Sequence, residues 1–448
     1  MSQRLFGTDG MRGVAFTPPL DRVTVTRLGA ALATHLRDQG RPPRVLLAGD
    51  TRASTPPLAE WVGGSLIAAG GEVAWAGVLP TPAVSHLLRE EGGYGAGVVV
   101  SASHNPAPDN GIKLVGPDGA KWPITEEACL EARLLGLAGE QRVASLPSAE
   151  PRFARRYLGW LGASLPERPL SGLKLVVDAA NGAASPVVEE FFASLGAVTT
   201  VIHARPDGVN INAGCGALHP EVLAASVLAT GANAGVAFDG DADRAVLVAA
   251  DGRVLDGDDV LLLWARELAR RGALAKRVVI ATVMSNLGLE LTLENEGIKL
   301  IRCPVGDREV WDAMRREGAV LGGEQSGHVI CSLLSVTGDG LLTAAHVLAV
   351  ACRLGLPLAD LSDLQRLPQV LLNVRVARRT PLDQVPELRA AISEAEGKLG
   401  RSGRVFVRYS GTEPLLRIMV EAAARDQATA TAELLGGVAV RHLGSPAT

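Results

Sequence analysis

The stretch RVLLAGDTRAS (44–54) decides the fold class, because a short apolar run leads directly into a polar loop that opens a helical pattern. The same succession of strand, small-residue loop and helix returns in LKLVVDAANGAAS (173–185) and RVVIATVMSNLGLE (277–290). Each apolar run is almost continuous rather than alternating, as expected of a sheet covered by helices on both faces. Three such units, at intervals of roughly 100 residues, predict three α/β domains of related build with mixed sheets.

The end of the chain has a different pattern. PQVLLNVRV (368–376) and RVFVRYSGTEPLLRIMVEA (404–422) alternate apolar and polar residues, which is typical of half-exposed strands. On the second strand we expect Arg417, Met419 and Glu421 to share one face and Leu416, Ile418 and Val420 the other. A helical pattern then closes the chain, so we expect a smaller fourth domain of α+β type. The predicted domains are residues 1–148, 149–249, 250–366 and 367–448.

Composition excludes several classes of protein. The chain has 448 residues, 47% hydrophobic and 21% charged, with a net charge of −4 and no basic tract, so a nucleic-acid partner is not expected. The N-terminus has no apolar leader pattern, and no apolar run is long enough to span a bilayer. Five scattered cysteines never form a C-x-x-C pair, which favours reduced thiols in a cytoplasmic protein over disulfides or a zinc site. These cysteines are Cys129, Cys215, Cys303, Cys331 and Cys352.

The loop SASHNPAPDNGIKL (101–114) separates two apolar runs and carries reactive side chains. Ser103 is followed by His104, and Lys113 comes where the chain becomes extended again. One interpretation is a polar turn whose side chains cap the backbone. The other is a nucleophilic or phosphate-carrying serine beside titratable groups. No G-x-S-x-G elbow surrounds the serine, so a hydrolase triad is disfavoured.

The stretch AFDGDADRAVLV places Asp239, Asp241 and Asp243 at every second position after a strand. In an extended segment such side chains point the same way, and carboxylates that close need a cation. Oxygen ligands alone favour Mg²⁺ or Ca²⁺. An EF-hand is excluded because the sixth and twelfth loop positions would be Arg244 and Ala250. A solvated acidic turn is the alternative.

Four further loops combine glycine with polar or cationic side chains. RYSGTEPLLR (408–417) suits a phosphate held by backbone N–H groups, hydroxyls and arginines, and GGEQSGH (322–328) suits vicinal sugar hydroxyls. FGTDGMRG (6–13) contains Arg12, a candidate for steadying phosphoryl charge. PVGDREVW (304–311) predicts a helix that begins at Asp307, where the helix N-terminus and Arg308 could both face an anion. Each could also be an ordinary turn or helix cap.

Taken together, these loops resemble the α-D-phosphohexomutase superfamily. GTDGMRG, SASHNP, DGDADR, GEQSGH and RYSGTEP occur in that superfamily's order and extend over almost the whole chain. The resemblance implies four domains around a central cleft. TVMSNLGLE (282–290) and Gln325 are most similar to the bacterial branch that interconverts glucosamine 6-phosphate and glucosamine 1-phosphate, on the route to UDP-N-acetylglucosamine and cell-wall precursors. Relatives acting on glucose or mannose phosphates usually have Met at the position of Gln325.

The resemblance also implies a role for each matching residue. Ser103 would be the phosphoserine, and Asp239, Asp241 and Asp243 would bind Mg²⁺ together with its phosphate. Proton transfer would fall to Lys113 and His328, and charge stabilisation to Arg12 and Arg244. Glu324 and Ser326 would hold the ring hydroxyls. The non-reacting phosphate would be held by Arg408, Ser410, Gly411, Thr412 and Arg417. A glucosamine or glucose 1,6-bisphosphate activator and a homodimer are further family expectations.

Three rival functions remain open at the level of sequence. A phosphomannomutase or phosphoglucomutase would use the same residues. Asp239 and Asp241 superficially suggest an aspartate-nucleophile phosphatase, and a non-catalytic sugar-phosphate-binding protein is the third possibility. For catalysis we expect desolvation and neighbouring cations to lower the pKa of Lys113, and the fourth domain to move so that a bisphosphate intermediate can turn end for end.

Overall fold

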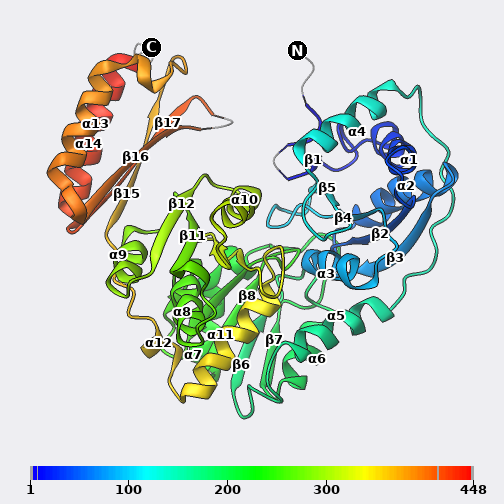
Figure 1. Ribbon diagram of the computed structural model, residues 1–448, viewed down its shortest axis with the longest axis horizontal. Coiled ribbons are helices and arrows are strands. Elements are labelled where there is room, and N and C mark those ends of the chain that lie inside the picture. The colour runs from blue at the N-terminus through cyan, green and yellow to red at the C-terminus, as the bar shows by residue number, and fades with distance from the viewer. Residues whose placement is uncertain (1–3, 8, 411–412, 445–448) are drawn as a thin grey trace. The chain divides into compact units, whose positions relative to one another are not determined.

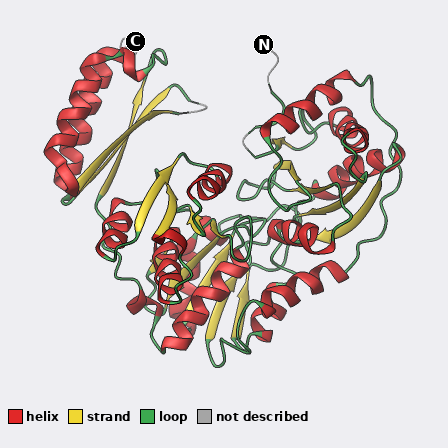
Figure 2. Cartoon of the chain, in the orientation of Figure 1, coloured by secondary structure: helices red, strands yellow, loops and turns green. Residues whose placement is uncertain are grey.

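The computed structural model describes residues 4–7, 9–410 and 413–444 (Figure 1). Contacts divide the chain into two compact units. The first comprises Met1–Met284 and Leu300–Asp363 and contains three α/β domains; the second comprises Ser285–Lys299 and Leu364–Thr448. Within each unit, helices pack against sheets (Figure 2). No helix among the described residues has both the length and the apolar character needed to cross a membrane.

The three α/β domains follow one another along the chain. The first contains β1 (Met11–Val14), α1 (Arg22–Asp38), β2 (Arg44–Gly49), α2 (Thr55–Ala68), β3 (Glu72–Val78), α3 (Thr81–Glu91), β4 (Ala96–Val100), β5 (Asp109–Val115) and α4 (Ile124–Gly136). The second contains α5 (Arg152–Ala163), β6 (Lys174–Asp178), α6 (Val188–Ser194), β7 (Val198–Ile202), α7 (Pro220–Thr230), β8 (Ala234–Phe238), β9 (Ala245–Ala249) and β10 (Val254–Leu255). The third contains α8 (Gly257–Arg270), β11 (Val278–Thr282), β12 (Lys299–Cys303), α10 (Asp307–Glu317), β13 (Leu321–Gly323), β14 (Val329–Cys331), α11 (Gly340–Leu354) and α12 (Leu358–Leu361).

The three sheets share one strand order. Their common part reads β5-β4-β2-β3, β9-β8-β6-β7 and β14-β13-β11-β12. In each, the third strand along the chain runs parallel to the first, and the fourth turns back antiparallel to the third. The prediction of three related α/β domains with mixed sheets is therefore confirmed.

One central strand of each of these sheets is buried from end to end. Every residue of β4, β8 and β11 is buried, which explains why these strands read as continuous apolar runs.

Two helices begin at side chains that cap their free backbone N–H groups. Asp21 caps α1 by accepting the Thr24 N–H, and Asp256 and Asp259 form a capping box at α8.

The C-terminal domain is an antiparallel sheet covered by helices. It contains β15 (Gln369–Arg375), α13 (Pro386–Leu399), β16 (Gly403–Tyr409), β17 (Leu415–Ala422) and α14 (Arg425–Leu443), with strand order β15-β17-β16. The helix α9 (Leu287–Asn295) clusters with this domain rather than with the α/β domain that surrounds it in sequence. The predicted α+β build is confirmed.

Glu421 is buried although the alternating pattern predicted a half-exposed strand. Its side chain is fully buried in β17, where it pairs with Arg404 at 2.9 Å and accepts the Leu287 N–H of α9 at 3.1 Å. The start of α9 lies against this carboxylate, so Glu421 is buried and paired instead of solvated.

Candidate functional site

Three loops singled out in the sequence occupy the same place in three successive domains. Each connects the third strand of the shared four-strand order to the antiparallel fourth strand. The serine loop (101–108) joins β4 to β5, the aspartate loop (239–244) joins β8 to β9, and the loop predicted to bind sugar hydroxyls, called the sugar loop (324–328), joins β13 to β14. Loops at the carboxyl ends of buried strands are the usual place for binding residues in α/β proteins. The shared topology therefore gives each domain one functional loop.

The serine loop is fixed by contacts to two neighbouring segments. Ser103 is 2% exposed and has a left-handed backbone with φ 52°. Its carbonyl oxygen accepts from Arg52 Nη2 at 3.2 Å and from Asn212 Nδ2 at 2.9 Å. Its N–H donates to Ser101 Oγ at 3.0 Å. Arg52 and Asn212 also bind the carbonyl oxygen of Asn105, so the strained backbone is held from both sides.

The aspartate loop is a tight turn, which corrects the extended conformation expected from the spacing. Ala242 is left-handed at φ 58° and its N–H closes the turn onto the Asp239 carbonyl at 3.0 Å. The carboxylates of Asp239, Asp241 and Asp243 nevertheless converge, each with an oxygen within 4.8 Å of the others. Gly240 is needed beside them because a Cβ there would lie 2.5 Å from the Ser103 carbonyl oxygen.

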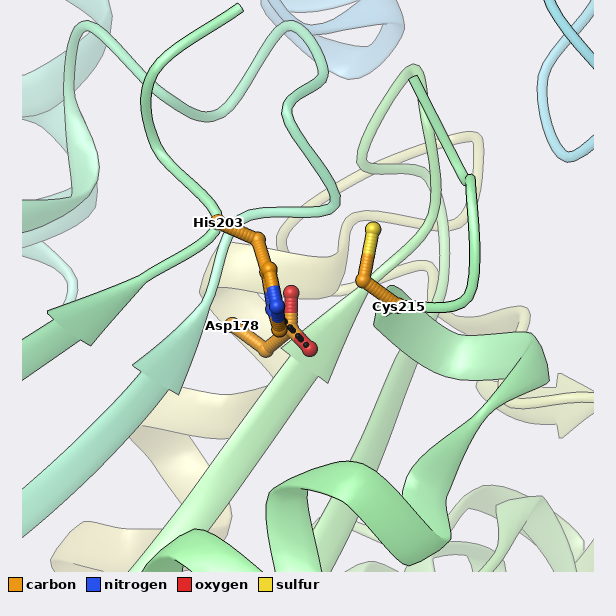
Figure 3. A group of neighbouring side chains, drawn as sticks. All are labelled: Asp178, His203 and Cys215. Carbon is orange, nitrogen blue, oxygen red and sulfur yellow. Dashed lines mark hydrogen bonds and ion pairs between the residues drawn. The ribbon is translucent and has the colours of Figure 1, made fainter. Parts of the chain in front are cut away.

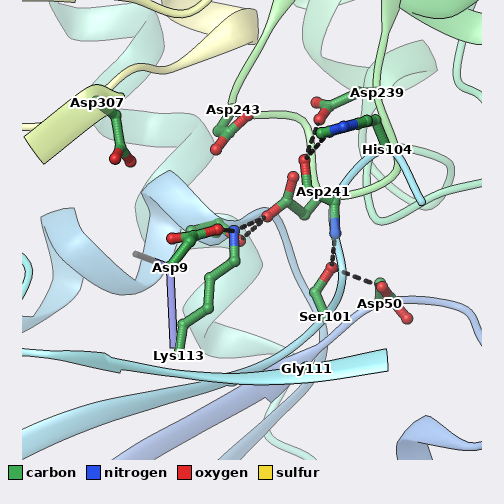
Figure 4. A network of polar contacts seen from close by, with 12 residues as sticks. Asp9, Asp50, Ser101, His104, Gly111, Lys113, Asp239, Asp241, Asp243 and Asp307 are labelled. Carbon is green, nitrogen blue, oxygen red and sulfur yellow. Dashed lines mark hydrogen bonds and ion pairs between the residues drawn. The ribbon is translucent and has the colours of Figure 1, made fainter. Parts of the chain in front are cut away.

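Each carboxylate of the cluster contacts a candidate residue from another domain, and Figure 4 shows Lys113 beside Asp241. Ser103 Oγ donates to Asp239 Oδ2 at 2.5 Å, and Lys113 Nζ donates to Asp241 Oδ2 at 2.8 Å. His328 Nδ1 lies 3.5 Å from Asp243 Oδ2. The serine, lysine and histidine singled out in the sequence therefore meet the aspartates at one buried centre.

The donor set fits a hard divalent cation. Asp241 Oδ1 and Asp243 Oδ1 are buried and accept no hydrogen bond from any described residue. Burial, followed by the charges of Asp243 and Asp241, raises the pKa of Asp239 well above its usual range. Repulsion among buried carboxylates and free oxygen lone pairs are both relieved by a cation with oxygen ligands.

Lys113 differs from the expectation of a lowered pKa. Burial opposes its charge, but the carboxylates of Asp241 and Asp9 outweigh burial, and its pKa is raised. Lys113 Nζ lies 2.8 Å from Asp241 and 3.2 Å from Asp9, so it is held here as an ammonium. The predicted lowering of the Lys113 pKa considered only burial and nearby cations, and the sequence did not show that these two carboxylates lie beside the ammonium.

His328 is buried between two fixed partners. Its Nε2 accepts the Gly338 N–H at 3.1 Å, while Nδ1 faces Asp243. Burial opposes protonation, but Asp243 and then Asp307 outweigh it and raise the pKa to about 9. Protonation must break the Gly338 hydrogen bond, because Nε2 cannot then accept.

Arg12 and Arg244 flank the centre. Arg12, on β1, pairs with Asp9, and Arg244 Nε lies 3.7 Å from Asp243 and 4.0 Å from Asp239. The imidazole of His104, 3.4 Å from Ser103 Oγ, has its pKa lowered to about 4 by burial and then by Arg244 and Arg12. Burial and the two arginines therefore keep the imidazole beside the serine hydroxyl uncharged at neutral pH.

A cavity of about 600 Å³ opens beside the centre between the first and third domains. Asp9, Lys113, Lys121 and Asp307 line it, and Lys121 Nζ lies 2.5 Å from Asp307. Arg308, considered as an anion ligand from sequence, instead pairs with Glu127 at 2.8 Å. The start of α10 therefore joins two domains through ion pairs.

The sugar loop lies against the aspartate loop and α10. Glu324 Oε1 accepts the Gly306 N–H at 3.0 Å, and Ser326 Oγ lies 3.4 Å from Glu324 Oε2. Gly327 is left-handed at φ 95°, and a Cβ there would lie 2.4 Å from the Ala245 carbonyl oxygen. The loop can thus approach the strand that follows the aspartates only with glycine at this position.

The phosphate loop belongs to the C-terminal unit. Arg408 on β16 is directly opposite Arg417 on β17, so two cations share one face. Arg417 pairs with Glu413 at 3.0 Å, and Ser410 is buried and accepts the Glu413 N–H at 3.3 Å. The predicted ligands Gly411 and Thr412 lie outside the described residues. The opposed arginines favour an anion between them.

Comparison with known families accounts for the whole arrangement. The α/β/α domains I, II and III of the phosphoglucomutase/phosphomannomutase family match residues 3–137, 157–252 and 256–367, and its C-terminal domain matches residues 371–435. The chain belongs to this family. The superfamily predicted from the five loops is therefore confirmed.

Individual relatives cover almost the full length. A phosphoglucosamine mutase of Solibacter usitatus is 45% identical over 99% of this chain and 100% of its own. One from Thermobifida fusca is 46% identical over 97% and 98% of the two chains. A crystal structure of a phosphoglucomutase/phosphomannomutase family protein from Burkholderia thailandensis superposes with a TM-score of 0.83 at 28% identity, covering 98% of each chain.

Sequence reasoning missed the residues that position the serine loop. Asp50 and Arg52 follow β2, the strand beside β4, and form a buried ion pair. Because the carboxyl ends of parallel neighbours meet at one edge, GDTR after β2 was a usable signal. Asn212 and Asp9 come from distant irregular segments, and nothing in the sequence spacing indicates their contacts.

Proposed function

We propose that this protein is a phosphoglucosamine mutase, which interconverts glucosamine 6-phosphate and glucosamine 1-phosphate through a phosphoserine at Ser103 for UDP-N-acetylglucosamine synthesis. The observation that carries the proposal is the 2.5 Å contact of Ser103 Oγ with Asp239 inside a buried aspartate cluster. A serine carrying a phosphate dianion beside three carboxylates requires a cation, and the free oxygens of that cluster suit one.

Asp239, Asp241 and Asp243 would hold Mg²⁺ together with the phosphate on Ser103. When bound, this ion supplies positive charge that neutralises the oxygens of the transferring phosphoryl group. Arg244, within 4.0 Å of Asp239, and Arg12 add fixed positive charge at the same place. Transfer then depends chiefly on positioning and electrostatics, as is general for phosphoryl transfer.

In the first step the bond between Ser103 Oγ and phosphorus breaks as the 1-oxygen of glucosamine 6-phosphate bonds to phosphorus. The 1-hydroxyl gives up its proton, Ser103 Oγ takes up a proton as it leaves phosphorus, and glucosamine 1,6-bisphosphate forms. After this intermediate turns end for end, its 6-phosphoryl group returns to Ser103 Oγ, which gives up its proton, and the 6-oxygen takes up a proton. Lys113 and His328, which face Asp241 and Asp243, are the groups proposed to move these protons.

The sugar must be accepted in two orientations. Glu324 and Ser326 would bind ring hydroxyls, which are present in both orientations. The phosphate that is not reacting would bind the loop of Arg408, Ser410, Gly411, Thr412 and Arg417. The opposed Arg408 and Arg417 support this role because a dianion relieves their repulsion.

A phosphomannomutase or phosphoglucomutase is the alternative, with the same machinery and a neutral hexose phosphate as substrate. The name shared by the full-length relatives and the presence of Gln325 in the sugar loop support the amino sugar. We further propose a cytoplasmic location, a homodimer, activation by glucosamine or glucose 1,6-bisphosphate, and domain boundaries near residues 148, 249 and 366.

Turnover of the purified protein tests the proposal. We expect kcat/KM for glucosamine 6-phosphate, with Mg²⁺ and a trace of 1,6-bisphosphate, to exceed that for glucose and mannose 6-phosphates. Intact-mass analysis should find one phosphoryl group, mapped to Ser103 and absent from Ser103→Ala, which should not turn over. A preference for a neutral hexose phosphate would select the alternative. Phosphate on Asp239 would indicate a phosphatase, and no turnover of any hexose phosphate would indicate a binding protein.

A further inference from the structure

A second group of metal-ligating side chains lies in the second α/β domain, apart from the aspartate cluster (Figure 3). Asp178 ends β6, His203 directly follows β7, and Cys215 lies in the irregular segment before α7. One ligand atom from each residue lies within 4.8 Å of the other two. The proposed mutase reaction uses none of these residues.

The surrounding contacts hold the carboxylate rigidly. Asp178 is fully buried, its Oδ1 accepts the Ala180 N–H at 2.9 Å, and its Oδ2 accepts the Gly216 N–H at 2.9 Å. His203 Nδ1 lies 3.0 Å from the same Oδ2. Cys215 is 1% exposed, and the His203 side chain is 32% exposed. Asp178 and Cys215 are thus buried, and the cluster is open to solvent on the side of His203.

We propose that Asp178, His203 and Cys215 bind a borderline-soft divalent cation of the zinc class. Sulfur, imidazole nitrogen and carboxylate oxygen are the donors such an ion prefers, whereas Mg²⁺ prefers oxygen alone. The 3.0 Å between His203 Nδ1 and Asp178 Oδ2 allows one ion to take the place of the proton they share. The ring proton then moves to Nε2, the Cys215 thiol proton is released, and a water fills the remaining position.

A nucleophilic Cys–His–Asp triad is the competing interpretation of the same residues. A nucleophile must reach its substrate as a thiolate. Cys215 is buried, and burial followed by the Asp178 charge raises the pKa of its thiol to about 11. Because Cys215 is buried, its sulfur is out of reach of a substrate, whereas it lies within 4.8 Å of the other two ligand atoms.

The cation would close a loop that supports the proposed active site. His203 and Cys215 form the two ends of the segment 203–215. Within it, Gly208 accepts the Ala53 N–H at 2.9 Å, and Asn212 donates to the Ser103 carbonyl oxygen. An ion joining the two ends would restrict the loop that holds the serine loop from the side of the second domain.

The ligand set escaped the sequence analysis for a simple reason. A search for paired cysteines rejects this chain, because each ligand comes from a different segment and no two are close in sequence. Asp178 and His203 meet because β6 and β7 are parallel neighbours whose carboxyl ends lie side by side. Cys215 joins them because the next residue, Gly216, donates its N–H to Asp178. The rejection of a zinc site on cysteine spacing therefore did not test this kind of site.

Cobalt spectroscopy on the metal-stripped, full-length protein tests the proposal, because a thiolate bound to Co²⁺ gives a near-ultraviolet charge-transfer band. Excess Mg²⁺ occupies the aspartate cluster during the titration. We expect one equivalent of Co²⁺ to produce the band and equimolar Zn²⁺ to remove it. Cys215→Ser should lose the band, whereas Cys129→Ser, which changes an exposed cysteine, should keep it.

His203→Asn provides a variant whose partly exposed side chain is not needed for the core. We expect it to weaken Co²⁺ binding by at least about tenfold, with an unchanged circular dichroism spectrum. A band that persists in Cys215→Ser, the absence of any band in the unmodified protein, or unchanged affinity in His203→Asn would each overturn the proposal. None of these readouts depends on mutase turnover.

Discussion

Removal of the Asn212 side chain should slow catalysis without unfolding the protein. Asn212 is left-handed at φ 57°, so glycine is the substitution that removes the amide without adding a Cβ at a strained position. Asn212→Gly deletes the two hydrogen bonds from Nδ2 to the carbonyl oxygens of Ser103 and Asn105, at 2.9 and 3.1 Å. Both carbonyls keep Arg52 as a donor.

The expected magnitude follows from these two bonds. Each contributes about 1 kcal/mol net, so the serine loop loses about 2 kcal/mol of support. The left-handed backbone of Ser103 costs about 1–2 kcal/mol by itself, so the loop relaxes once that support is removed. If most of the loss falls on the loop, kcat/KM should drop by about 10–30-fold, since 1.4 kcal/mol corresponds to a factor of ten.

The assay is the conversion of glucosamine 6-phosphate, together with intact mass for phosphoserine occupancy and thermal unfolding. Asn210→Ala is the matched control: it lies in the same loop and bonds to Arg205, with no hydrogen bond to the serine loop. We expect the control to retain activity within about threefold, a ceiling of roughly 0.7 kcal/mol. The reasoning is refuted if a folded Asn212→Gly matches the unmodified protein, or if both variants lose activity equally.

Three further outcomes are expected. Adding Mg²⁺ should raise the melting temperature of the unmodified protein. Without Mg²⁺, Asp239→Asn should be more stable than the unmodified protein, because one repelling carboxylate is gone, and Mg²⁺ should stabilise this variant little. A full Mg²⁺ response in Asp239→Asn would contradict the cation site. Arg404→Met should destabilise the C-terminal domain by about 3–5 kcal/mol, because it removes the ion pair of the buried Glu421 carboxylate with Arg404. Adding Glu421→Gln should recover part of the loss in urea titrations, and equal stability of the single variant would count against the importance of this ion pair. Burial lowers the pKa of His86 and His346 to about 4, so below pH 6.5 the unfolded chain binds protons that the folded chain does not, and the free energy of unfolding falls as the pH drops from 6.5 towards 4. In urea titrations, His346→Gln should reduce that slope by up to about 1.4 kcal/mol per pH unit, and an unchanged slope would exclude its contribution.

Local sequence patterns were sufficient for the architecture. The near-continuous strands predicted buried mixed sheets, and alternation after Leu367 predicted the separate C-terminal sheet. The aspartate spacing predicted convergence correctly for the wrong reason, because the turn at Ala242, and not an extended strand, brings the carboxylates together. Each of these three predictions needed only residues that are neighbours in the chain.

The charges and the burial around individual side chains could not be predicted from local sequence patterns. The raised pKa of Lys113 depends on Asp9 and Asp241, and the burial of Glu421 depends on α9; each pairing joins segments far apart in the chain. The hydrogen bonds of Arg52 and Asn212 to the serine loop likewise join segments that are far apart in the chain.

The sequence by itself determined which chemical groups this protein has and which strand each functional loop follows, because apolar periodicity and loop composition are local properties of the chain. Only the tertiary structure decided which charges meet, which are buried and which hydrogen bonds hold Ser103. The physical reason is that Coulomb and desolvation energies depend on distance and burial in space, and neither quantity is encoded in sequence separation.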